Sequence, residues 1–400
     1  MMMGDEYALG GRCLICGSTD IVVLLEILQM PVHCNVLWPS REEAIQAPRG
    51  DIWLGLCRAC GHIFNLAFNP ALVEYTLAYE NSLHFSPKFQ AYARSLAARL
   101  IERYDLHGKD IIEIGCGKGD FLMLLCELGG NRGVGFDPGY APDPGADRGT
   151  GQVTLIRDFY SERYADCRAD LICCRHVLEH IPFPRDFLSS VRRSIGNRLN
   201  TVVFLEVPNA LFTLRDLGVW DLIYEHCSYF CSCSLSRLFT LCGFDVCDLT
   251  EAYAGQFLCV EALPGGGGST GSIDIPGDDL IEILSGATVF ADRYRNKVET
   301  WKCRLKRMAQ TKQRSVVWGA GSKGVTFLNT LEVQDQVECV VDINPRKHGM
   351  YIAGTGQSIV PPEFLRDYQP EVIIVMNPIY TDEIRLLTES LGLTPEFMCV

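Results

Sequence analysis

A glycine-rich turn follows an apolar run and has the residue types for binding a nucleoside. Residues 111–119 read Ile-Ile-Glu-Ile-Gly-Cys-Gly-Lys-Gly. Gly115, Gly117 and Gly119 permit a tight turn and let the backbone approach a ligand closely. Glu113 places a carboxylate where a phosphate-binding loop carries Lys with Ser or Thr, so this turn suits a cation. The pattern favours S-adenosylmethionine (SAM), a sulfonium nucleoside, although the motif alone also fits a plain strand-to-helix turn.

Acidic and aromatic residues close the apolar runs that come next, in the order expected of a nucleotide-binding sheet. Asp137 follows the glycines by about 20 residues, where an acid recognises ribose. Asp158 and Phe159 close the following run, and we expect them to hold the adenine. A buried run at residues 169–174 leads into the last two candidates. The predicted cofactor-binding residues are Glu113, Gly115, Gly117, Gly119, Asp137, Asp158, Phe159, Arg175 and His176.

Two C-x-x-C pairs lie in the first 60 residues, and each is followed by glycine. Cys13 and Cys16 form the first pair, and Cys57 and Cys60 the second. Each pair can present two thiolates from a tight turn, so together they complete a tetrahedral S₄ site. We expect a closed, structural zinc site. The alternatives are buried free thiols or a redox pair, and two separated copies argue against redox chemistry.

A second group of reactive side chains follows the predicted fifth strand, residues 201–209. His226 is the best candidate base, because imidazole both takes and returns a proton near neutral pH. Glu225 would orient its ring, and Tyr224 would donate a hydrogen bond to an oxyanion. The alternative is that these residues are structural.

Two candidates come from elsewhere in the chain. His180 follows the fourth predicted strand and would join the same site, or else cap its own segment. Tyr79 opens the polar and aromatic stretch 79–86, which has little amphipathic period and so suits the lining of a ligand site. Asn81 and Ser86 could equally serve as helix caps there.

Composition limits the function classes. The chain has 400 residues, 48% of them hydrophobic, and a formal charge of −13. This charge disfavours nucleic acid as a partner. No apolar run approaches the roughly 20 residues that cross a bilayer, and residues 1–6 lack the features of a signal peptide. We expect a cytoplasmic protein with no membrane partner, whose 19 cysteines are reduced.

The pattern predicts several domains, because single cores rarely exceed about 250 to 300 residues. Residues 1–80 form the expected zinc-binding domain. Residues 81–264 alternate helical periods with short apolar runs, which is typical of a parallel α/β sheet. Residues 265–278 contain four consecutive glycines and read as a flexible linker. Residues 279–400 would form a helical connector and a Rossmann-like domain.

The last domain carries a second glycine motif of a different kind. Gly319, Gly321 and Gly324 match G-x-G-x-x-G between a predicted strand and helix, and Asp342 stands where a ribose acid would. NAD is disfavoured, because no hydride chemistry is visible nearby. Glycines kept for the turn and the helix packing, or another bound nucleotide, are the alternatives.

Taken together, these motifs resemble the sugar C-methyltransferases across essentially the whole chain. The resemblance lies in both cysteine pairs, residues 79–86, Glu113–Gly119, Val177–His180, Tyr224–His226 and the second glycine motif. It implies an α/β chain with a class I SAM-dependent methyltransferase fold, Rossmann-like, between an N-terminal zinc-ribbon-like domain and a second, C-terminal Rossmann-like domain. It also implies SAM as cofactor and zinc in a structural role.

The family methylates the carbon next to the ketone of a nucleotide-linked 4-keto deoxysugar through an enolate. For this chain the resemblance implies a sugar nucleotide as the small-molecule substrate, His226 as base, and Tyr79, His180, Tyr224 and Glu225 around the sugar. The last domain would help to hold the nucleotide. One departure is that family members commonly read Tyr-His-Glu-His where this chain has Tyr224-Glu225-His226.

That departure leaves two alternatives open. An N- or O-methyltransferase of a small secondary metabolite would keep the cofactor site and the zinc domain but need no enolate. A non-catalytic, zinc-stabilised nucleotide-binding protein would keep both glycine motifs without turnover.

Overall fold

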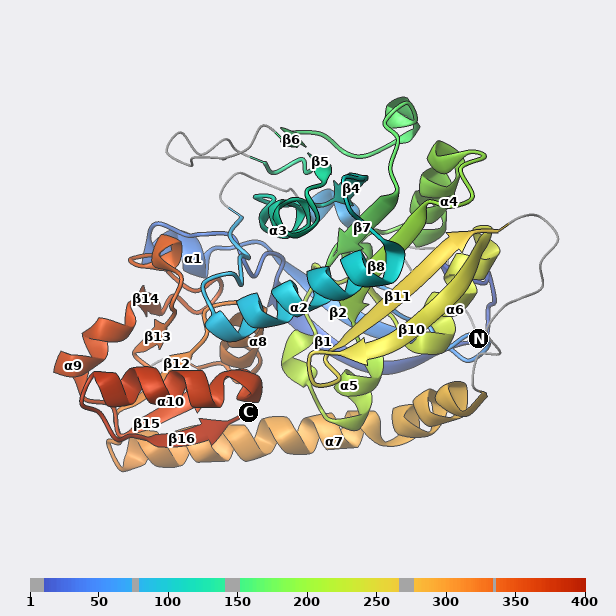
Figure 1. The fold of residues 1–400 in the computed structure, drawn as a ribbon. Helices are drawn as coiled ribbons and strands as arrows, with labels where there is room; N and C mark the ends of the chain where they lie inside the picture. Colours follow the sequence, from blue (N-terminus) through green and yellow to red (C-terminus); the bar gives the residue numbers. More distant parts are fainter. Residues whose placement is uncertain (1–10, 74–78, 141–151, 266–276, 334–335) are drawn as a thin grey trace.

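The chain folds around three β-sheets, shown in Figure 1. The computed structural model describes residues 11–73, 79–140, 152–265, 277–333 and 336–400. Most of the expected linker, residues 266–276, lies outside these ranges. We name the sheets N-terminal, central and C-terminal by their order in the chain. Within the described ranges, every helix falls short of the combined length and apolarity that a membrane span requires.

The N-terminal sheet is antiparallel and has the order β1-β2-β3-β9. Its first three strands come from the cysteine-rich region, whereas the fourth comes from far downstream. Its strands are β1 (Ile21–Pro31), β2 (Arg49–Cys57), β3 (Ile63–Asn65) and β9 (Ser228–Tyr229), and the short helix α1 (Arg41–Ile45) lies between β1 and β2. Sequence patterns did not predict β9, because a two-residue strand has no period of its own.

The central sheet has the order β10-β11-β8-β7-β4-β5-β6. The strands from β8 to β6 are parallel, and the β10–β11 hairpin is antiparallel at one edge. The strands are β4 (Asp110–Ile114), β5 (Arg132–Phe136), β6 (Val153–Ile156), β7 (Leu171–Arg175), β8 (Val202–Pro208), β10 (Phe244–Ala252) and β11 (Phe257–Pro264). This is the parallel α/β sheet that the sequence predicts, with its final hairpin.

Helices cover both faces of the central sheet, because neighbouring strand residues point to opposite sides. Ile111 belongs to the core beneath α2 and α3, and Ile112 to the core that includes α4 and α6. The second core also takes in Cys13, Cys57 and Cys60 of the N-terminal region. The helices are α2 (Pro87–Tyr104), α3 (Asp120–Gly129), α4 (Pro184–Ile195), α5 (Ala210–Arg215) and α6 (Ser232–Leu241).

The C-terminal sheet is parallel throughout, in the order β14-β13-β12-β15-β16. Its strand order reverses at β12, which carries the second glycine motif at its carboxyl end. The strands are β12 (Ser315–Trp318), β13 (Cys339–Val341), β14 (Ser358–Val360), β15 (Val372–Val375) and β16 (Glu396–Cys399), and the helices are α8 (Ser322–Thr330), α9 (Leu365–Tyr368) and α10 (Thr381–Ser390).

One long helix, α7 (Gly277–Gln310), runs along the molecule beneath the C-terminal sheet and α5 (Figure 1). It contacts α5, α6 and β1, so the expected connector is a single helix. Single 3₁₀ turns complete the fold: η1 (Pro70–Leu72), η2 (Glu162–Tyr164), η3 (Leu178–His180), η4 (Val219–Asp221), η5 (Pro345–Lys347), η6 (Pro362–Phe364) and η7 (Pro378–Tyr380).

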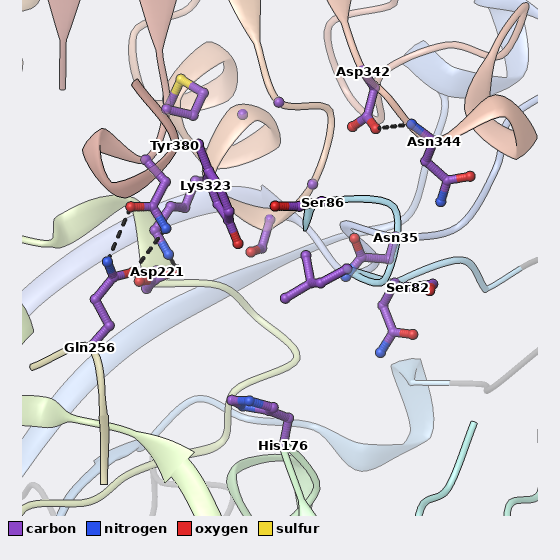
Figure 2. A pocket seen from close by; sticks show the side chains of 18 of the residues that line it. Asn35, Ser82, Ser86, His176, Asp221, Gln256, Lys323, Asp342, Asn344 and Tyr380 are labelled. Atoms are coloured by element: carbon purple, nitrogen blue, oxygen red, sulfur yellow. Dashed lines mark hydrogen bonds and ion pairs between the residues drawn. The ribbon is translucent and has the colours of Figure 1, made fainter. Parts of the chain in front are cut away.

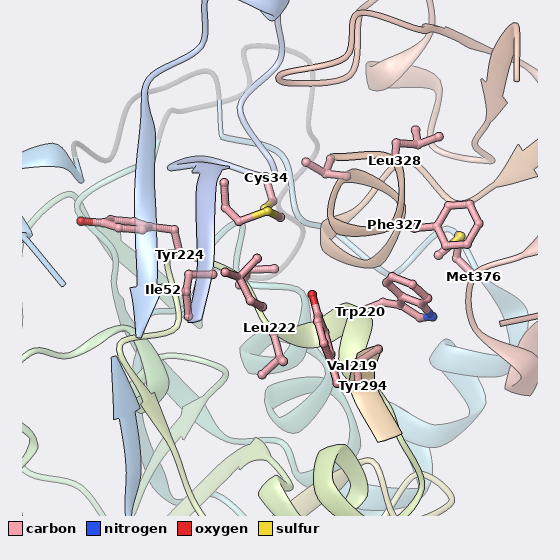
Figure 3. Packing of buried hydrophobic residues seen from close by; sticks show 14 of the residues in the cluster. Cys34, Ile52, Val219, Trp220, Leu222, Tyr224, Tyr294, Phe327, Leu328 and Met376 are labelled. Atoms are coloured by element: carbon pink, nitrogen blue, oxygen red, sulfur yellow. The ribbon is translucent and has the colours of Figure 1, made fainter. Parts of the chain in front are cut away.

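The largest core cluster joins the three regions around Phe327 of α8 (Figure 3). The ring of Phe327 lies 5.0 Å from that of Trp220 in η4 and 5.3 Å from that of Trp301 in α7, with both rings edge to face. All three side chains are buried. Helix α8 of the C-terminal region is therefore packed directly against the segment that precedes the candidate base.

Replacing Phe327 with Ala is expected to lower the free energy of unfolding by about 3 to 5 kcal/mol, because a fully buried ring leaves a cavity. Chemical denaturation measures this change. The matched control is Phe364→Ala, since Phe364 is 41% exposed and its loss should cost little. Equal effects of the two changes would contradict this description of the core.

Candidate active site

The first glycine motif forms a left-handed turn between β4 and α3. Gly115, Gly117 and Gly119 have φ values of +70°, +55° and +83°, a region that favours glycine. At Gly115 a Cβ atom would lie 2.1 Å from Val177, so a larger residue would also clash. The predicted role of the glycines as turn residues is therefore confirmed by their backbone geometry.

The carboxylate of Asp137 holds this turn in place. Its Oδ2 accepts a hydrogen bond of 2.8 Å from the Gly117 amide, and its Oδ1 accepts one of 2.8 Å from Gly139. Burial raises the pKa of Asp137, although these two amides oppose the shift. Asp137 thus organises the glycine turn, and it also lines the cavity above that turn, which we call the cofactor cavity.

Glu113 lies under the turn and is almost fully buried. Burial raises its pKa to about 8, against the opposing charge of Arg175. Arg175 is itself held by Glu206, at 2.8 Å. Without a ligand, Glu113 is therefore largely protonated at neutral pH, and an approaching cation would favour its ionised form.

A cavity of about 650 Å³ opens above this turn. Asp158 borders it and is engaged by Arg163 and by the hydroxyl of Tyr164, at 2.5 Å. Phe159 is 64% exposed at the cavity, so its ring is available to a flat ligand. The predicted cofactor residues that line the cavity are Glu113, Gly115, Gly117, Asp137, Asp158, Phe159, Arg175 and His176. Gly119 lies in the same turn.

A second cavity, of about 290 Å³, lies between the carboxyl ends of the central and C-terminal sheets (Figure 2). It is bordered on one side by the second glycine motif and on the other by the strand ends of the central sheet. Tyr79, His176 and His180 line both cavities, so the two spaces adjoin. A ligand in the second cavity can therefore reach a ligand in the first.

His226 and His180 meet at the second cavity. Their rings are edge to face with centroids 4.8 Å apart. Burial and, to a smaller extent, the neighbouring His180 lower the pKa of His226 to about 4, although Glu179, Asp221 and Glu225 oppose the shift. His226 is consequently neutral at physiological pH and able to accept a proton.

Glu179 completes this cluster, and the sequence analysis did not assign it a role. It is 1% exposed, and one of its carboxylate oxygens lies within 4.8 Å of ring nitrogens of His180 and His226. A buried carboxylate stabilises a neighbouring imidazolium. Glu179 directly precedes His180 in the chain, and this adjacency is the signal that could have identified it as a site residue.

His176 ties this cluster to the cofactor side. Its Nε2 lies 2.7 Å from Glu206 and its Nδ1 lies 3.6 Å from Glu179. Burial alone would lower the pKa of His176, but these two carboxylates raise it to about 9. His176 is therefore protonated, and it neutralises the two acids rather than serving as a base.

Tyr224 and Glu225 lie elsewhere than the sequence analysis expected. Tyr224 is buried against Phe68, and its hydroxyl accepts a 2.9 Å hydrogen bond from the amide of Asn69. Glu225 accepts a 2.9 Å hydrogen bond from the amide of Cys34. Neither is among the residues lining the two cavities, so both anchor the segment instead of facing a ligand. Tyr79, by contrast, lines both cavities, within 3.4 Å of Asn35.

The four cysteines converge as predicted. Their sulfur atoms lie within 4.8 Å of one another, with 3.5 Å between Cys13 and Cys60 and 3.6 Å between Cys16 and Cys57. A Zn–S bond of about 2.3 Å separates tetrahedral sulfurs by roughly 3.8 Å, so the group fits this ion. The glycine after each pair has a left-handed backbone, which forms the two tight turns.

The second glycine motif repeats the arrangement of the first. Asp342 accepts hydrogen bonds from the amides of Ala320 and Asn344, at 2.9 Å and 2.8 Å, and lies 3.6 Å from Lys347. At Gly324 a Cβ atom would lie 2.0 Å from the carbonyl oxygen of Gly319. The geometry of the turn is therefore sufficient to explain why glycines and an acid occupy these positions.

Comparison with known families assigns two parts of the chain. A methyltransferase domain model matches residues 89–249, and a model described as a C-methyltransferase C-terminal domain matches residues 284–391. The chain is a SAM-dependent methyltransferase with the class I Rossmann-like α/β fold, and the second match supports a C-methyltransferase. This assignment sets aside the non-catalytic alternative.

One curated relative extends over both matched regions. It is the C-methyltransferase NovU of Streptomyces niveus, which is 26% identical over 395 residues and covers 93% of this chain and 91% of its own length.

Among solved structures, a Burkholderia thailandensis 1,6-didemethyltoxoflavin N1-methyltransferase is 16% identical, with a TM-score of 0.35, over 51% of this chain and 96% of that one. A Synechocystis magnesium protoporphyrin IX methyltransferase with bound SAH is 17% identical, with a TM-score of 0.34, over 47% and 91%.

The raised pKa of Glu113 predicts a pH-dependent stability in the absence of cofactor. The folded state holds a proton that the unfolded state releases near pH 4.5, so stability should fall by up to about 1.4 kcal/mol per pH unit between pH 5 and 8. A Glu113→Gln variant, which cannot ionise, should lose this part of the slope. Denaturation of both proteins across this range measures the difference, and parallel curves would contradict the assignment.

Proposed function

We propose that this enzyme transfers a methyl group from SAM to the carbon next to the ketone of a nucleotide-linked 4-keto deoxysugar. The single observation that carries this proposal is the neutral, buried His226 at a cavity that adjoins the cofactor cavity. A carbon acceptor needs a base to remove its α-proton, whereas a basic nitrogen would not. The C-terminal family match and the relative described above support carbon as the acceptor.

In the proposed reaction, His226 removes the proton from the carbon next to the ketone. The electrons of that C–H bond form an enolate, whose negative charge resides on the ketone oxygen. The enolate carbon then attacks the methyl group of SAM, and the C–S bond breaks to leave S-adenosylhomocysteine (SAH). Tyr79 lines both cavities, and its hydroxyl is the donor that we assign to the enolate oxygen.

The buried charges around His226 suit this proton transfer. Once protonated, the ring would sit in a low-dielectric site, where an uncompensated charge is unfavourable. Glu179 supplies the opposing charge next to it. His176 pairs with Glu206 on the cofactor side and also lies near Glu179. Glu179 therefore has imidazole neighbours of both kinds, the protonated His176 and the neutral His226. Most of the remaining rate would come from positioning the two ligands.

The nucleotide half of the acceptor would lie against the C-terminal, Rossmann-like domain. The second cavity is bordered there by Gly319, Gly321, Lys323 and Lys347. Lysine side chains and backbone amides at a helix N-terminus suit phosphate oxygens. Asp342 is already engaged by the turn, which supports a nucleotide held through its phosphates and disfavours NAD bound through ribose.

Replacing His226 with Gln should strongly slow proton removal. When SAH replaces SAM, the wild-type enzyme should exchange the α-proton of a nucleotide-linked 4-keto deoxysugar with solvent deuterium. The variant should slow this exchange roughly 10²- to 10⁴-fold, the usual contribution of a general base. Nuclear magnetic resonance of the acceptor measures the exchange, and calorimetry should show unchanged SAH binding.

The matched control is His107→Gln, because His107 is exposed at the end of α2. That variant should exchange at the wild-type rate. Methyl transfer without any exchange in the wild-type enzyme would instead identify a nitrogen or oxygen acceptor, which is the alternative function.

We also propose that the four thiolates of Cys13, Cys16, Cys57 and Cys60 hold one structural zinc ion. With four protein ligands, such a site leaves no position for substrate. The ion would tie the turn that precedes β1 to the turn that joins β2 to β3.

A Cys57→Ser variant should lose most of its zinc, measured by elemental analysis of the purified protein, and should unfold at a lower temperature. Cys247→Ser is the matched control, because Cys247 is exposed in β10 and away from the cluster. Full zinc content in the Cys57 variant would refute the site.

A further inference from the structure

A buried carboxylate links the cofactor turn to the C-terminal domain. Glu80 is 4% exposed, yet it lies in the polar segment that borders both cavities. The sequence pattern predicts a site role for its neighbour Tyr79 but none for Glu80. The proposed reaction assigns Glu80 no chemistry, so its burial and its partners require another explanation.

The partners of Glu80 come from separate parts of the fold. Its Oε2 accepts a 2.5 Å hydrogen bond from the ammonium group of Lys118 and lies 3.5 Å from Arg346. Its Oε1 accepts a 3.1 Å hydrogen bond from the side-chain amide of Asn344. Burial alone would raise the pKa of Glu80, but Lys118 and Asn344 lower it. The carboxylate is thus ionised and fully engaged.

Two of these partners, Lys118 and Asn344, are each connected to a glycine turn. Lys118 lies between Gly117 and Gly119, inside the turn of the cofactor cavity. Asn344 donates its backbone amide to Asp342, which in turn accepts from Ala320 in the second glycine motif. A continuous series of hydrogen bonds therefore runs from one turn to the other, and Glu80 is its central member.

The backbone of Glu80 is anchored as well. Its amide donates to the carbonyl of Asn35 in the N-terminal region, at 2.8 Å, and its Oε1 also accepts from the amide of Ser82. Ser82 and Asn35 both line the second cavity, which we call the acceptor cavity (Figure 2). Parts of all three regions are consequently fixed by one residue.

We propose that Glu80 is a positioning residue that makes the cofactor turn depend on the C-terminal domain. Because Lys118 is held by a carboxylate that the C-terminal domain also holds, a change at Asn344 alters SAM and SAH binding without touching either ligand. Asn344 lines the acceptor cavity and is absent from the lining of the cofactor cavity. An effect of Asn344 on the cofactor must therefore be transmitted, through Glu80 or through Arg346, whose amide Asn344 caps and which lines the cofactor cavity.

The test measures SAH affinity by calorimetry, so it requires no acceptor. Asn344→Asp keeps the oxygen that caps Arg346 but sets a negative charge against Glu80. It should weaken SAH binding roughly 5- to 50-fold, within the range of typical coupling between sites. The double variant E80Q/N344D should recover most of this loss, because a glutamine amide can donate to the new carboxylate. A purely structural role for Asn344 would give no such recovery.

Glu261→Gln is the matched control, because Glu261 is equally buried and paired with Arg99, away from both cavities. It should leave SAH affinity unchanged. Lys118→Met, which removes the partner on the cofactor side, should weaken SAH binding and make a further N344D change silent. Wild-type affinity in N344D, or a double variant no better than N344D, would overturn the proposal. Failure to methylate a keto sugar would refute the proposed acceptor and leave this coupling standing.

Discussion

The pairing of β3 with β9 is the constraint on which the candidate site depends. Ile63 and Phe64 pair with Tyr229 and Ser228, so the segment carrying His226 forms the edge of the N-terminal sheet. The amide of Asn65 donates to the carbonyl of Cys227, next to the base. The second cysteine pair ends just before β3, so the four-cysteine cluster adjoins the strand that pairs with the His226 segment.

Buried charge sets the chemistry of this site. Glu206, Glu179 and Glu113 are each almost completely withdrawn from solvent. Arg175 and His176 compensate the first two, and the pKa of Glu206 is lowered although burial alone would raise it. Glu113 lacks an equally close cation, and burial dominates its pKa. A sulfonium ligand would complete this arrangement, which is the electrostatic reason that the turn favours SAM.

Two glycine turns with the same internal hydrogen bonding serve different spaces. In each, an acid at the end of the neighbouring strand accepts one amide from the turn and one from two residues further along. The first turn has a buried carboxylate beneath it, whereas the second is bordered by Lys323 and Lys347. The same backbone device thus has different neighbouring side chains in the two turns, which agrees with the proposal of a cationic nucleoside at the first turn and a phosphate at the second.

Local sequence determined the elements and the turns. Glycines with left-handed backbones, alternating apolar strands and paired cysteines each act within a few residues, so their patterns predicted both glycine motifs, the central sheet and the thiolate cluster. Tertiary structure decided which polar side chains face a ligand. Tyr224 and Glu225 adjoin His226 in the chain, yet the N-terminal region binds them, while Glu179 and Glu80 become central through contacts with distant residues. Side-chain direction in irregular segments is set by long-range packing and by the cost of burying an unpaired charge, and neither leaves a periodic trace in the sequence.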